Sequence, residues 1–220
     1  MQSRLSFFGE CVPLPPFEKL PFPVCFHPDM LIAEIGGKLW IHADYMEGRR
    51  LLASLGVPFV LSDTPVFASY PGDIRLNCFC VGDFFVSNEK YVSAEALWFA
   101  RQSGFCSVSV SQGYAKCSCA VAGNAIATAD RGIAKALRKA GADVLLLDPC
   151  PIGIDVYDTG FIGGASVLLD EKTLGFFGKI EAFGQYERLK DFFADHGVDL
   201  VSLGDGPLFD YGGSVSFVLH

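Results

Sequence analysis

The chain has 220 residues, of which 50% are hydrophobic and 19% are charged, a composition typical of a globular protein rather than a disordered one. Its net charge of -8 repels phosphate backbones, and no run of lysine and arginine offsets that charge, so we expect no binding to nucleic acid. No uninterrupted apolar run reaches the roughly 18 residues of a membrane-spanning helix, and residues 1–16 lack the apolar core and cleavage site of a signal peptide, so we expect a cytoplasmic protein without membrane contact.

Eight cysteines would suit four disulfides in a small secreted protein. In a chain of this length without an export signal, we expect them to be reduced thiols instead. No Cys-x-x-Cys pair occurs, so the sequence gives no support to a thioredoxin-like redox site.

One pattern occurs four times along the chain: two short apolar strands joined by a turn, a helix closed by a glycine, and a third apolar strand. The four ββαβ segments cover 29–61, 77–110, 117–148 and 165–203. The glycines that close the predicted helices are Gly56, Gly104, Gly141 and Gly197. Because no single segment can bury its own apolar face, these spacings of roughly 40 to 50 residues predict a repeat architecture.

The third copy shows the pattern most clearly. Gly123-Asn124 joins two β runs and predicts a hairpin. Asp130 is the predicted N-cap of the helix, because its carboxylate can accept hydrogen bonds from the unpaired amides of the first turn. Ile133 and Leu137 fall on one face of that helix and the basic side chains fall on the other, which predicts one buried and one exposed face.

The two ends of the chain decide between an open stack of units and a closed ring. Residues 212–220 supply one more first strand, and residues 4–8 supply an unassigned strand, so pairing them would complete a degenerate fifth unit from 212–220 and 1–25. We therefore predict a single α/β domain over residues 1–220, a propeller of five ββαβ units closed by its N- and C-terminal strands, since closure removes exposed sheet edges. A doubly wound parallel sheet is the alternative, although the frequent hairpins predict antiparallel pairing and no G-x-G-x-x-G follows a strand.

In such a ring, the segments that enter the first strand of each unit converge on the central axis. Loops that converge on a rigid scaffold commonly form ligand sites, and polar and reactive residues are concentrated in these five segments. The entry segments are 26–30, 71–78, 112–119, 158–166 and 209–216. The residues expected to face a common pocket are His27, Asp29, Asp73, Arg75, Cys117, Asp158 and Asp210.

The repeated plan resembles the pentein fold of the guanidino-group-modifying superfamily, which includes arginine deiminases, amidinotransferases and dimethylarginine hydrolases. His27-Pro28-Asp29, followed by an apolar strand, resembles the His-x-Asp motif in which the histidine is the acid/base. Residues 160–166, GFIGGAS, resemble the Gly-Gly segment of the superfamily, and residues 113–118, GYAKCS, resemble the segment in which a cysteine nucleophile opens a first strand. The chain is also similar to an uncharacterised bacterial branch of this fold.

The resemblance implies a thiol-dependent hydrolase or transferase that acts on a guanidino or related small cationic substrate in a central acidic pocket. In that chemistry a thiolate attacks the guanidinium carbon, a histidine moves protons, and carboxylates bind the cation. The resemblance makes Cys117 and His27 the candidate catalytic residues, and it implies no cofactor and no metal. The candidate substrate-binding residues are Asp29, Asp73, Arg75, Asp158, Gly163, Gly164 and Asp210.

Two features depart from the superfamily pattern. Its enzymes carry the nucleophile in the last unit, whereas no cysteine follows Cys150 in this chain. The Gly163-Gly164 pair is followed by Ala165 rather than by an acidic or amide residue, so Asp158 is the expected substitute from the same loop. Both departures favour the alternative function, a non-catalytic binding protein of this fold that lacks a complete catalytic set.

Structural roles compete with each functional assignment. Cys78 and Cys80 lie two apart on a strand, as do Cys117 and Cys119, so each pair faces one side. These four thiols can be small packing side chains or ligands of a zinc site, as well as supplying a nucleophile.

The histidines and the loop aspartates have similar alternatives. The His27 ring can cap a neighbouring backbone group, and we expect His42 and His196 to be structural or solvated. Asp158 and Asp210 precede glycine-rich turns, where aspartate commonly makes side-chain turns.

Overall fold

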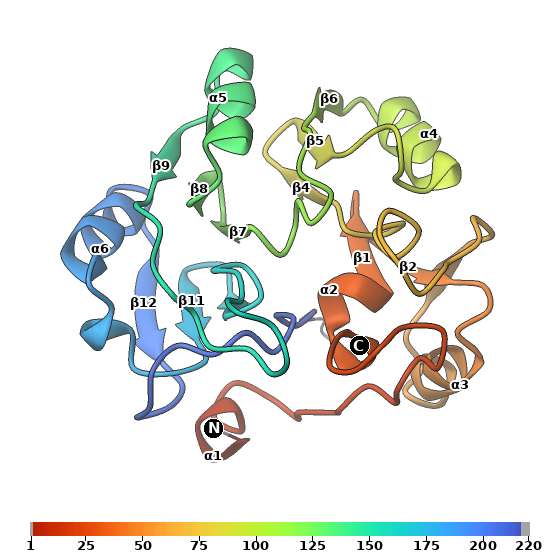
Figure 1. Cartoon of the computed structure of the whole chain (residues 1–220), viewed down its shortest axis with the longest axis horizontal. Helices are drawn as coiled ribbons and strands as arrows, with labels where there is room; N and C mark the ends of the chain where they lie inside the picture. Colours follow the sequence, from red (N-terminus) through yellow and green to blue (C-terminus); the bar gives the residue numbers. More distant parts are fainter. Residues whose placement is uncertain (1, 217–220) are drawn as a thin grey trace.

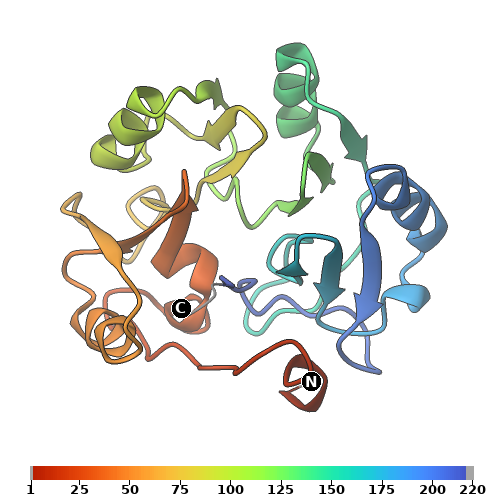
Figure 2. The ribbon, with the colours of Figure 1, turned by 180° about the vertical axis from the view of Figure 1, so that it is seen from behind.

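The computed structural model of the protein describes residues 2–216, which form a mixed α/β structure of four three-stranded sheets around a common centre (Figures 1 and 2). In chain order the sheets are β1 (Ile32–Ile35), β2 (Lys38–His42) and β3 (Phe59–Ser62); β4 (Phe79–Val81), β5 (Phe84–Ser87) and β6 (Cys106–Ser109); β7 (Cys119–Ala122), β8 (Ala125–Thr128) and β9 (Val144–Leu146); and β10 (Ser166–Asp170), β11 (Thr173–Phe176) and β12 (Asp199–Ser202).

All four sheets have the same topology. The first two strands pair antiparallel as a hairpin, and the third strand pairs parallel to the second. The crossover helices between second and third strands lie on the outside of the ring (Figure 1). They are α3 (Met46–Ser54), α4 (Ala94–Gln102), α5 (Arg131–Ala140) and α6 (Tyr186–Asp195). A doubly wound sheet is therefore wrong for this chain, because the hairpins divide the strands among separate small sheets.

The helix boundaries follow local chemistry that the sequence displays. The Asp130 carboxylate accepts a hydrogen bond from the Ile133 amide at 2.8 Å and caps α5, as predicted. Ser93 caps α4 in the same manner through the Ala96 amide. The glycines predicted to close the four helices all have positive φ, a conformation that other residues adopt only with strain.

The hydrophobic core is continuous from one unit to the next rather than confined within units. Trp40 of the first sheet packs in one cluster with Phe85 of the second. Val86 of the second sheet packs in another with Ile126 of the third, and the third and fourth sheets share a larger cluster that includes the helix residue Phe193. Because each face is covered by the neighbouring unit, the isolated units are not expected to be stable.

The chain ends differ from the sequence prediction. Residues 4–8 do not form a strand: they belong to the short helix α1 (Gln2–Leu5) and the turn after it, and the Arg4 guanidinium binds the Ser202 carbonyl at 3.2 Å and the Asp205 carboxylate at 2.7 Å. Of the predicted final strand 212–220, residues 212–216 are irregular and residues 217–220 lie outside the described part of the chain. The fifth unit is therefore not a sheet within residues 2–216.

Two short helices also alter the predicted start of the first unit. The segment before β1 contains η1 (Val24–Phe26) and α2 (Pro28–Leu31), so Met30 and Leu31 are helical rather than part of the first strand. Pro28 explains this change, because its fixed φ and missing amide suit the first position of a helix. Elsewhere the predicted elements lie within a few residues of the observed ones.

No helix in the described range 2–216 is both long enough and apolar enough to cross a lipid bilayer.

Candidate functional site

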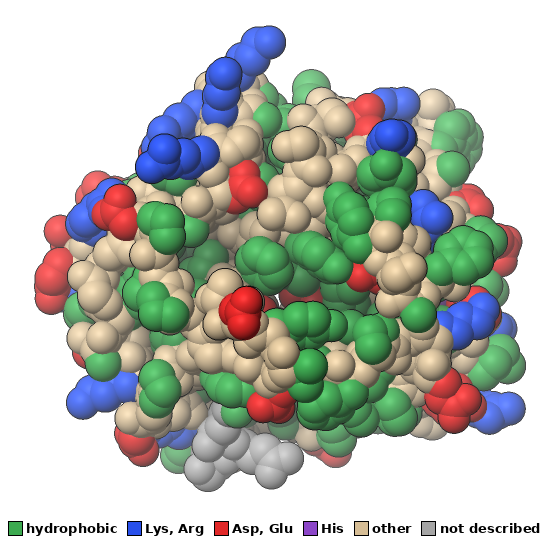
Figure 3. All heavy atoms as spheres, viewed as in Figure 1, with side chains coloured by type: hydrophobic (Ala, Val, Ile, Leu, Met, Phe, Trp, Pro, Cys, Tyr) green, Lys and Arg blue, Asp and Glu red, His purple; other side chains and the backbone are tan. Residues whose placement is uncertain are grey.

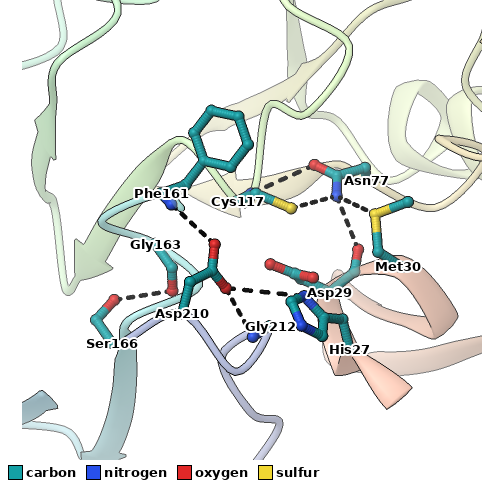
Figure 4. A network of polar contacts seen from close by, with 10 residues as sticks. All are labelled: His27, Asp29, Met30, Asn77, Cys117, Phe161, Gly163, Ser166, Asp210 and Gly212. Carbon is teal, nitrogen blue, oxygen red and sulfur yellow. Dashed lines mark hydrogen bonds and ion pairs between the residues drawn. The ribbon is translucent and has the colours of Figure 1, made fainter. Parts of the chain in front are cut away.

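The centre of the ring is built from equivalent positions in the four units. Met30, Asn77, Cys117 and Gly164 each lie two residues before the first strand of their unit. Asp210 joins them from the segment after the last sheet, and Figure 4 shows Met30, Asn77, Cys117 and Asp210 converging from different parts of the chain. The centre is thus assembled entirely from contacts between units.

A cavity of about 220 Å³ opens at this centre. Figure 3 shows hydrophobic side chains around a hollow in the middle of the ring, with acidic side chains within and beside it. Four of the predicted site residues line the cavity: His27, Asp73, Cys117 and Asp210. The remaining wall consists of Val24, Met30, Tyr114, Ile154, Tyr157, Thr159 and Phe161.

The Cys117 thiol is buried at the edge of this cavity, with a residue exposure of 4%. Its sulfur accepts a hydrogen bond from the Asn77 amide, with Nδ2 and Sγ 2.8 Å apart. Burial raises the pKa of the thiol well above its usual value, and the negative charges of Asp29 and Asp210 raise it further, while the Asn77 hydrogen bond opposes them. At neutral pH the empty site therefore holds a protonated thiol.

The Asp29 carboxylate lies between the Cys117 sulfur and the His27 ring (Figure 4). Both of its oxygens are buried, and neither has a partner of good hydrogen-bond geometry among the described residues. Its backbone is held from two sides, because its amide donates to the Gly212 carbonyl at 3.0 Å and its carbonyl accepts from Asn77 at 3.0 Å. A buried carboxylate without donors is costly, and such a group commonly marks a place where a ligand supplies them.

Asp210 is the second carboxylate of the centre and is 2% exposed. Its two oxygens accept hydrogen bonds from the backbone amides of Phe161 and Gly212, each at 2.8 Å. Burial, followed by the negative charge of Asp29, raises the pKa of Asp210 to about 7, and the two amides oppose that shift. This carboxyl group therefore changes charge near neutral pH.

His27 faces Asp210 across a gap of 3.7 Å between Nδ1 and the nearer carboxylate oxygen. The ring is 6% exposed, and burial lowers its pKa although the charges of Asp29 and Asp155 act in the opposite direction. A neutral imidazole beside a cavity can accept a proton and return it, which is the role expected of an acid/base.

Asp73 supplies a third carboxylate to the cavity wall. One oxygen accepts a hydrogen bond from the Tyr114 hydroxyl at 2.7 Å, and the other is buried and unpartnered among the described residues. Burial raises the pKa of Asp73, and burial together with the Asp73 carboxylate raises the pKa of Tyr114. The tyrosine therefore remains a hydrogen-bond donor, and its ring stacks toward Phe161 at a centroid distance of 5.9 Å to form an aromatic wall.

Three residues predicted to face the pocket do not line this cavity: Arg75, Asp158 and Asp29. Asp29 lines a neighbouring cavity together with Cys78 and Lys116. The Arg75 guanidinium donates to the backbone carbonyls of Pro65 at 3.1 Å and Tyr91 at 2.7 Å, so it holds the loop before the second sheet. Asp158 is exposed on the loop that supplies Tyr157 and Thr159 to the cavity wall. Proximity in sequence to a converging segment was therefore not sufficient to place the Arg75 or Asp158 side chain at the centre.

Gly163 and Gly164 shape the centre through the absence of side chains. Their amides both donate to the Cys117 carbonyl, at 2.8 and 3.2 Å. A Cβ on Gly163 would overlap carbonyl oxygens of the Cys117 segment, and one on Gly164 would overlap the Asp210 carboxylate. Both positions therefore require glycine for close packing around Cys117 and Asp210.

Asn77 and Tyr114 are central residues that the sequence reasoning did not single out. Asn77 is 1% exposed and contacts both Cys117 and the segment of Asp29. Asn77 lies two residues before the first strand of its unit, and Cys117 lies at the same position in the next unit. This equivalence is the signal in the sequence that could have identified Asn77. Tyr114 lies in the entry segment of Cys117, but nothing in the sequence distinguishes its ring from a packing residue.

Cys78, Cys119, His42 and His196 do not line the cavity. Cys78 and Cys119 are buried in hydrophobic clusters, and burial raises the pKa of Cys119 to about 12. The four-cysteine zinc site is not formed, since no group of three His, Cys, Asp or Glu residues within 2–216 has a geometry able to hold a metal ion. The buried His42 ring contacts the Met30 carbonyl at 3.1 Å, and His196 pairs with Asp143 at 3.3 Å.

A family model matches nearly the whole chain. The profile described as "Family of unknown function (DUF6873)" matches residues 1–215. No curated protein matches the chain.

Several solved structures are similar at low sequence identity. A mutant DDAH from Pseudomonas aeruginosa complexed with citrulline has a TM-score of 0.49 and 14% identity, over 86% of this chain and 72% of that one. A dimethylarginine dimethylaminohydrolase adduct with 4-chloro-2-hydroxymethylpyridine has a TM-score of 0.47 and 13% identity, over 83% and 72% of the two chains. Agmatine deiminase from C. jejuni has a TM-score of 0.46 and 11% identity, over 79% of this chain and 65% of that one.

Proposed function

The chain belongs to the DUF6873 family of unknown function, and from the geometry of its centre we propose that it is a thiol-dependent hydrolase or transferase acting on a small guanidino or related cationic substrate. One observation carries this proposal. Asp29, Asp73 and Asp210 are buried around the same thiol and histidine, and both oxygens of Asp29 and one of Asp73 lack a hydrogen bond of good geometry from the described residues. A planar cation with several N–H groups supplies both the charge and the donors that this arrangement lacks.

The same cation would activate the nucleophile. Its positive charge offsets the Asp29 and Asp210 charges that, after burial itself, raise the Cys117 pKa. A thiolate is therefore favoured when the substrate is bound and disfavoured when the cavity is empty. This coupling restricts the reactive form of the thiol to the substrate complex.

The proposed reaction proceeds in two steps. The Cys117 thiol gives its proton to the neutral His27 and its sulfur forms a bond to the guanidinium carbon. A C–N bond then breaks, and the amine leaves with that proton from His27. In a hydrolase, water deprotonated by His27 then attacks the same carbon and the S–C bond breaks, which gives a ureido product and restores the thiol. In a transferase, a second amine takes the place of water and receives the amidino group.

A non-catalytic cation-binding protein is the second candidate. The observation that favours it is that, within residues 2–216, no cationic side chain donates to the Cys117 thiol, whose pKa burial raises. Such a protein would use the same carboxylates without forming a covalent intermediate.

We also propose that the ring is a five-unit, pentein-like domain whose fifth unit is formed by the chain ends. Three hydrogen bonds support this proposal. The Arg4 guanidinium donates to the Ser202 carbonyl, the Asp29 amide donates to the Gly212 carbonyl, and the Ser216 hydroxyl donates to the Leu168 carbonyl at 2.8 Å. They bring both ends of the chain between the first and fourth units.

Calorimetric titration with methylguanidine and its neutral isostere methylurea tests the cation site. We expect the protein to bind methylguanidine at least about 10-fold more tightly than methylurea, because the carboxylates attract the cation and not its neutral isostere. A tenfold preference corresponds to about 1.4 kcal/mol of binding free energy. Asp210→Asn should reduce that preference, whereas Asp158→Asn, at an exposed position, should leave it unchanged. Equal affinity for the two compounds, or binding of neither, would overturn the proposed function.

Turnover separates the two candidates. Conversion of an alkylguanidine to its ureido or amidino-transfer product, detected by mass spectrometry and lost in Cys117→Ser, is the result expected of the enzyme. Tight binding of the guanidine with no conversion and no covalent adduct is the result expected of the non-catalytic protein.

A further inference from the structure

Asn77 joins three successive units at the centre of the ring. Its Nδ2 lies 3.0 Å from the Asp29 carbonyl, 3.3 Å from the Met30 sulfur and 2.8 Å from the Cys117 sulfur, so its two N–H groups are shared among three acceptors. Its Oδ1 accepts from the backbone amides of Lys116 at 2.8 Å and Cys117 at 3.3 Å. The side chain is fully enclosed, so all of these contacts are made without competition from water.

The orientation of the Asn77 amide is fixed by its partners. Backbone amides can only donate, so the atom facing Lys116 and Cys117 must be the oxygen. The opposite atom faces the Asp29 carbonyl, which can only accept, and must therefore be the nitrogen. A rotation of the amide by 180° would place its N–H groups against the Lys116 and Cys117 N–H groups, and its oxygen against the Asp29 carbonyl oxygen.

This fixed orientation gives Asn77 two separate effects on Cys117. The oxygen holds the backbone on both sides of the Lys116–Cys117 peptide, which sets the direction of the thiol toward the cavity. The nitrogen donates to the sulfur, and a donor of this kind favours the thiolate over the thiol, in opposition to burial and to the two nearby carboxylates.

We propose that Asn77 is the positioning residue for the Cys117 thiol and the donor that makes its thiolate accessible. The role is assigned by the hydrogen bond between Nδ2 and Sγ and by the two backbone anchors on Oδ1. It rests on the proposed function only in taking Cys117 as the reacting group. The donor to the sulfur in this arrangement is Asn77 rather than His27.

Asn77→Asp removes the donor and, where the new carboxyl is ionised, adds a negative charge beside the sulfur; both changes disfavour the thiolate, and the uncharged Asn77→Ser variant tests the loss of the donor alone. The replacement is isosteric and keeps an oxygen for the Lys116 and Cys117 amides, but it puts an acceptor in place of the donor that faces the sulfur. Asn88→Asp is the matched control, because Asn88 is also buried, donates to the Ser111 carbonyl at 3.0 Å and accepts from the Lys90 amide, yet lies away from the thiol.

The measurement is the pH dependence of Cys117 alkylation by neutral chloroacetamide, followed by peptide mass spectrometry so that the other cysteines do not contribute. We expect Asn77→Asp to move the alkylation midpoint upward by at least about one pH unit and to slow the reaction at pH 8 about tenfold, since one pKa unit is a factor of ten in thiolate. Asn88→Asp should leave the profile at its wild-type position, even where it lowers thermal stability.

A second variant keeps the test decisive if Asn77→Asp does not fold. Asn77→Ser is smaller and uncharged, and it should also raise the alkylation midpoint because the hydroxyl is too short to reach both the sulfur and the backbone amides. An unchanged profile in the folded Asn77 variant, or equal shifts in the Asn77 and Asn88 variants, would overturn the role of Asn77. Neither result depends on turnover or on methylguanidine binding, so the failure of this inference is distinguishable from the failure of the proposed function.

Discussion

The outer rim of the ring, formed by the four crossover helices, and its centre, formed by the entry segments, satisfy their polar groups in different ways. On the rim, Asp130 caps an amide only three residues away in the chain. At the centre, the Asn77 amide and the Cys117 sulfur that it contacts are 40 residues apart, and the Asp29 carboxylate lacks a hydrogen bond of good geometry from the described residues. The rim is thus satisfied locally, whereas the centre retains buried charge that a ligand can neutralise.

The largest expected effect is a failure of close packing at the centre. A Cβ on Gly164 would overlap the Asp210 carboxylate, so Gly164→Ala should destabilise the protein by about 4 kcal/mol or more, a loss of the size caused by overpacking combined with a displaced buried charge. Chemical denaturation measures this loss.

Gly184 provides the matched glycine at the rim. A Cβ there meets nothing within 4 Å, so Gly184→Ala should change the free energy of unfolding by no more than about 0.5 kcal/mol. Comparable losses in the two variants would show that the centre is no more tightly packed than the rim.

The next effect is a pH dependence of stability that originates at the centre. The folded-state pKa of Asp210 is about 7, above the unfolded value of about 3.9, so the folded protein binds more protons at this group between those values. Its stabilising contribution is complete below about pH 4 and is lost as the pH rises through 7. The loss is on the order of 1 kcal/mol per pH unit, or roughly 2 kcal/mol between pH 5 and pH 7, where the slope falls off as Asp210 itself ionises.

Comparing wild type with Asp210→Asn isolates this contribution. His27 has a lowered pKa and acts with the opposite sign, but it is present in both proteins and its own contribution largely cancels in the difference. Denaturation at several pH values should show wild type losing stability relative to Asp210→Asn from pH 5 to pH 7. Parallel pH profiles would contradict the raised pKa of Asp210.

The smallest effect is expected at the rim. Asp130→Ala removes the N-cap of α5 and should cost about 1 kcal/mol, with no change in methylguanidine binding or in Cys117 alkylation. Asp191→Ala, at an exposed position on α6, should cost less than about 0.5 kcal/mol. A cap variant that altered the chemistry of the centre would show that rim and centre are coupled.

The difference between local contacts at the rim and long-range contacts at the centre also explains which features could be predicted from the sequence. The hairpins, the helix-closing glycines and the Asp130 cap depend on residues within a few positions of one another, so their chemistry is visible in the sequence. The chain ends were predicted less well, because residues 4–8 form a helical turn fixed by contacts with Ser202 and Asp205, far away in the chain.

The site residues that could be predicted from the sequence are those whose place in the repeated unit brings them to the centre. Cys117, Asp29 and Asp210 reach the centre because their segments enter or close the units, whereas Arg75 and Asp158 lie in similar segments and point elsewhere. Whether such a side chain turns inward depends on long-range partners, such as the Tyr91 carbonyl for Arg75, which spacing does not specify.

Competition between a cationic and a neutral alkylating reagent tests most directly the claim that the centre recruits a cation to Cys117. Chloroacetamidine and chloroacetamide have nearly the same shape, and with each the S–C bond forms as chloride leaves and the thiol proton is lost. We predict that the ratio of their rate constants at Cys117, divided by the ratio for a small thiol in solution, is at least about 10 at pH 7.5, because the three carboxylates attract the amidinium. A normalised ratio near one would contradict the account.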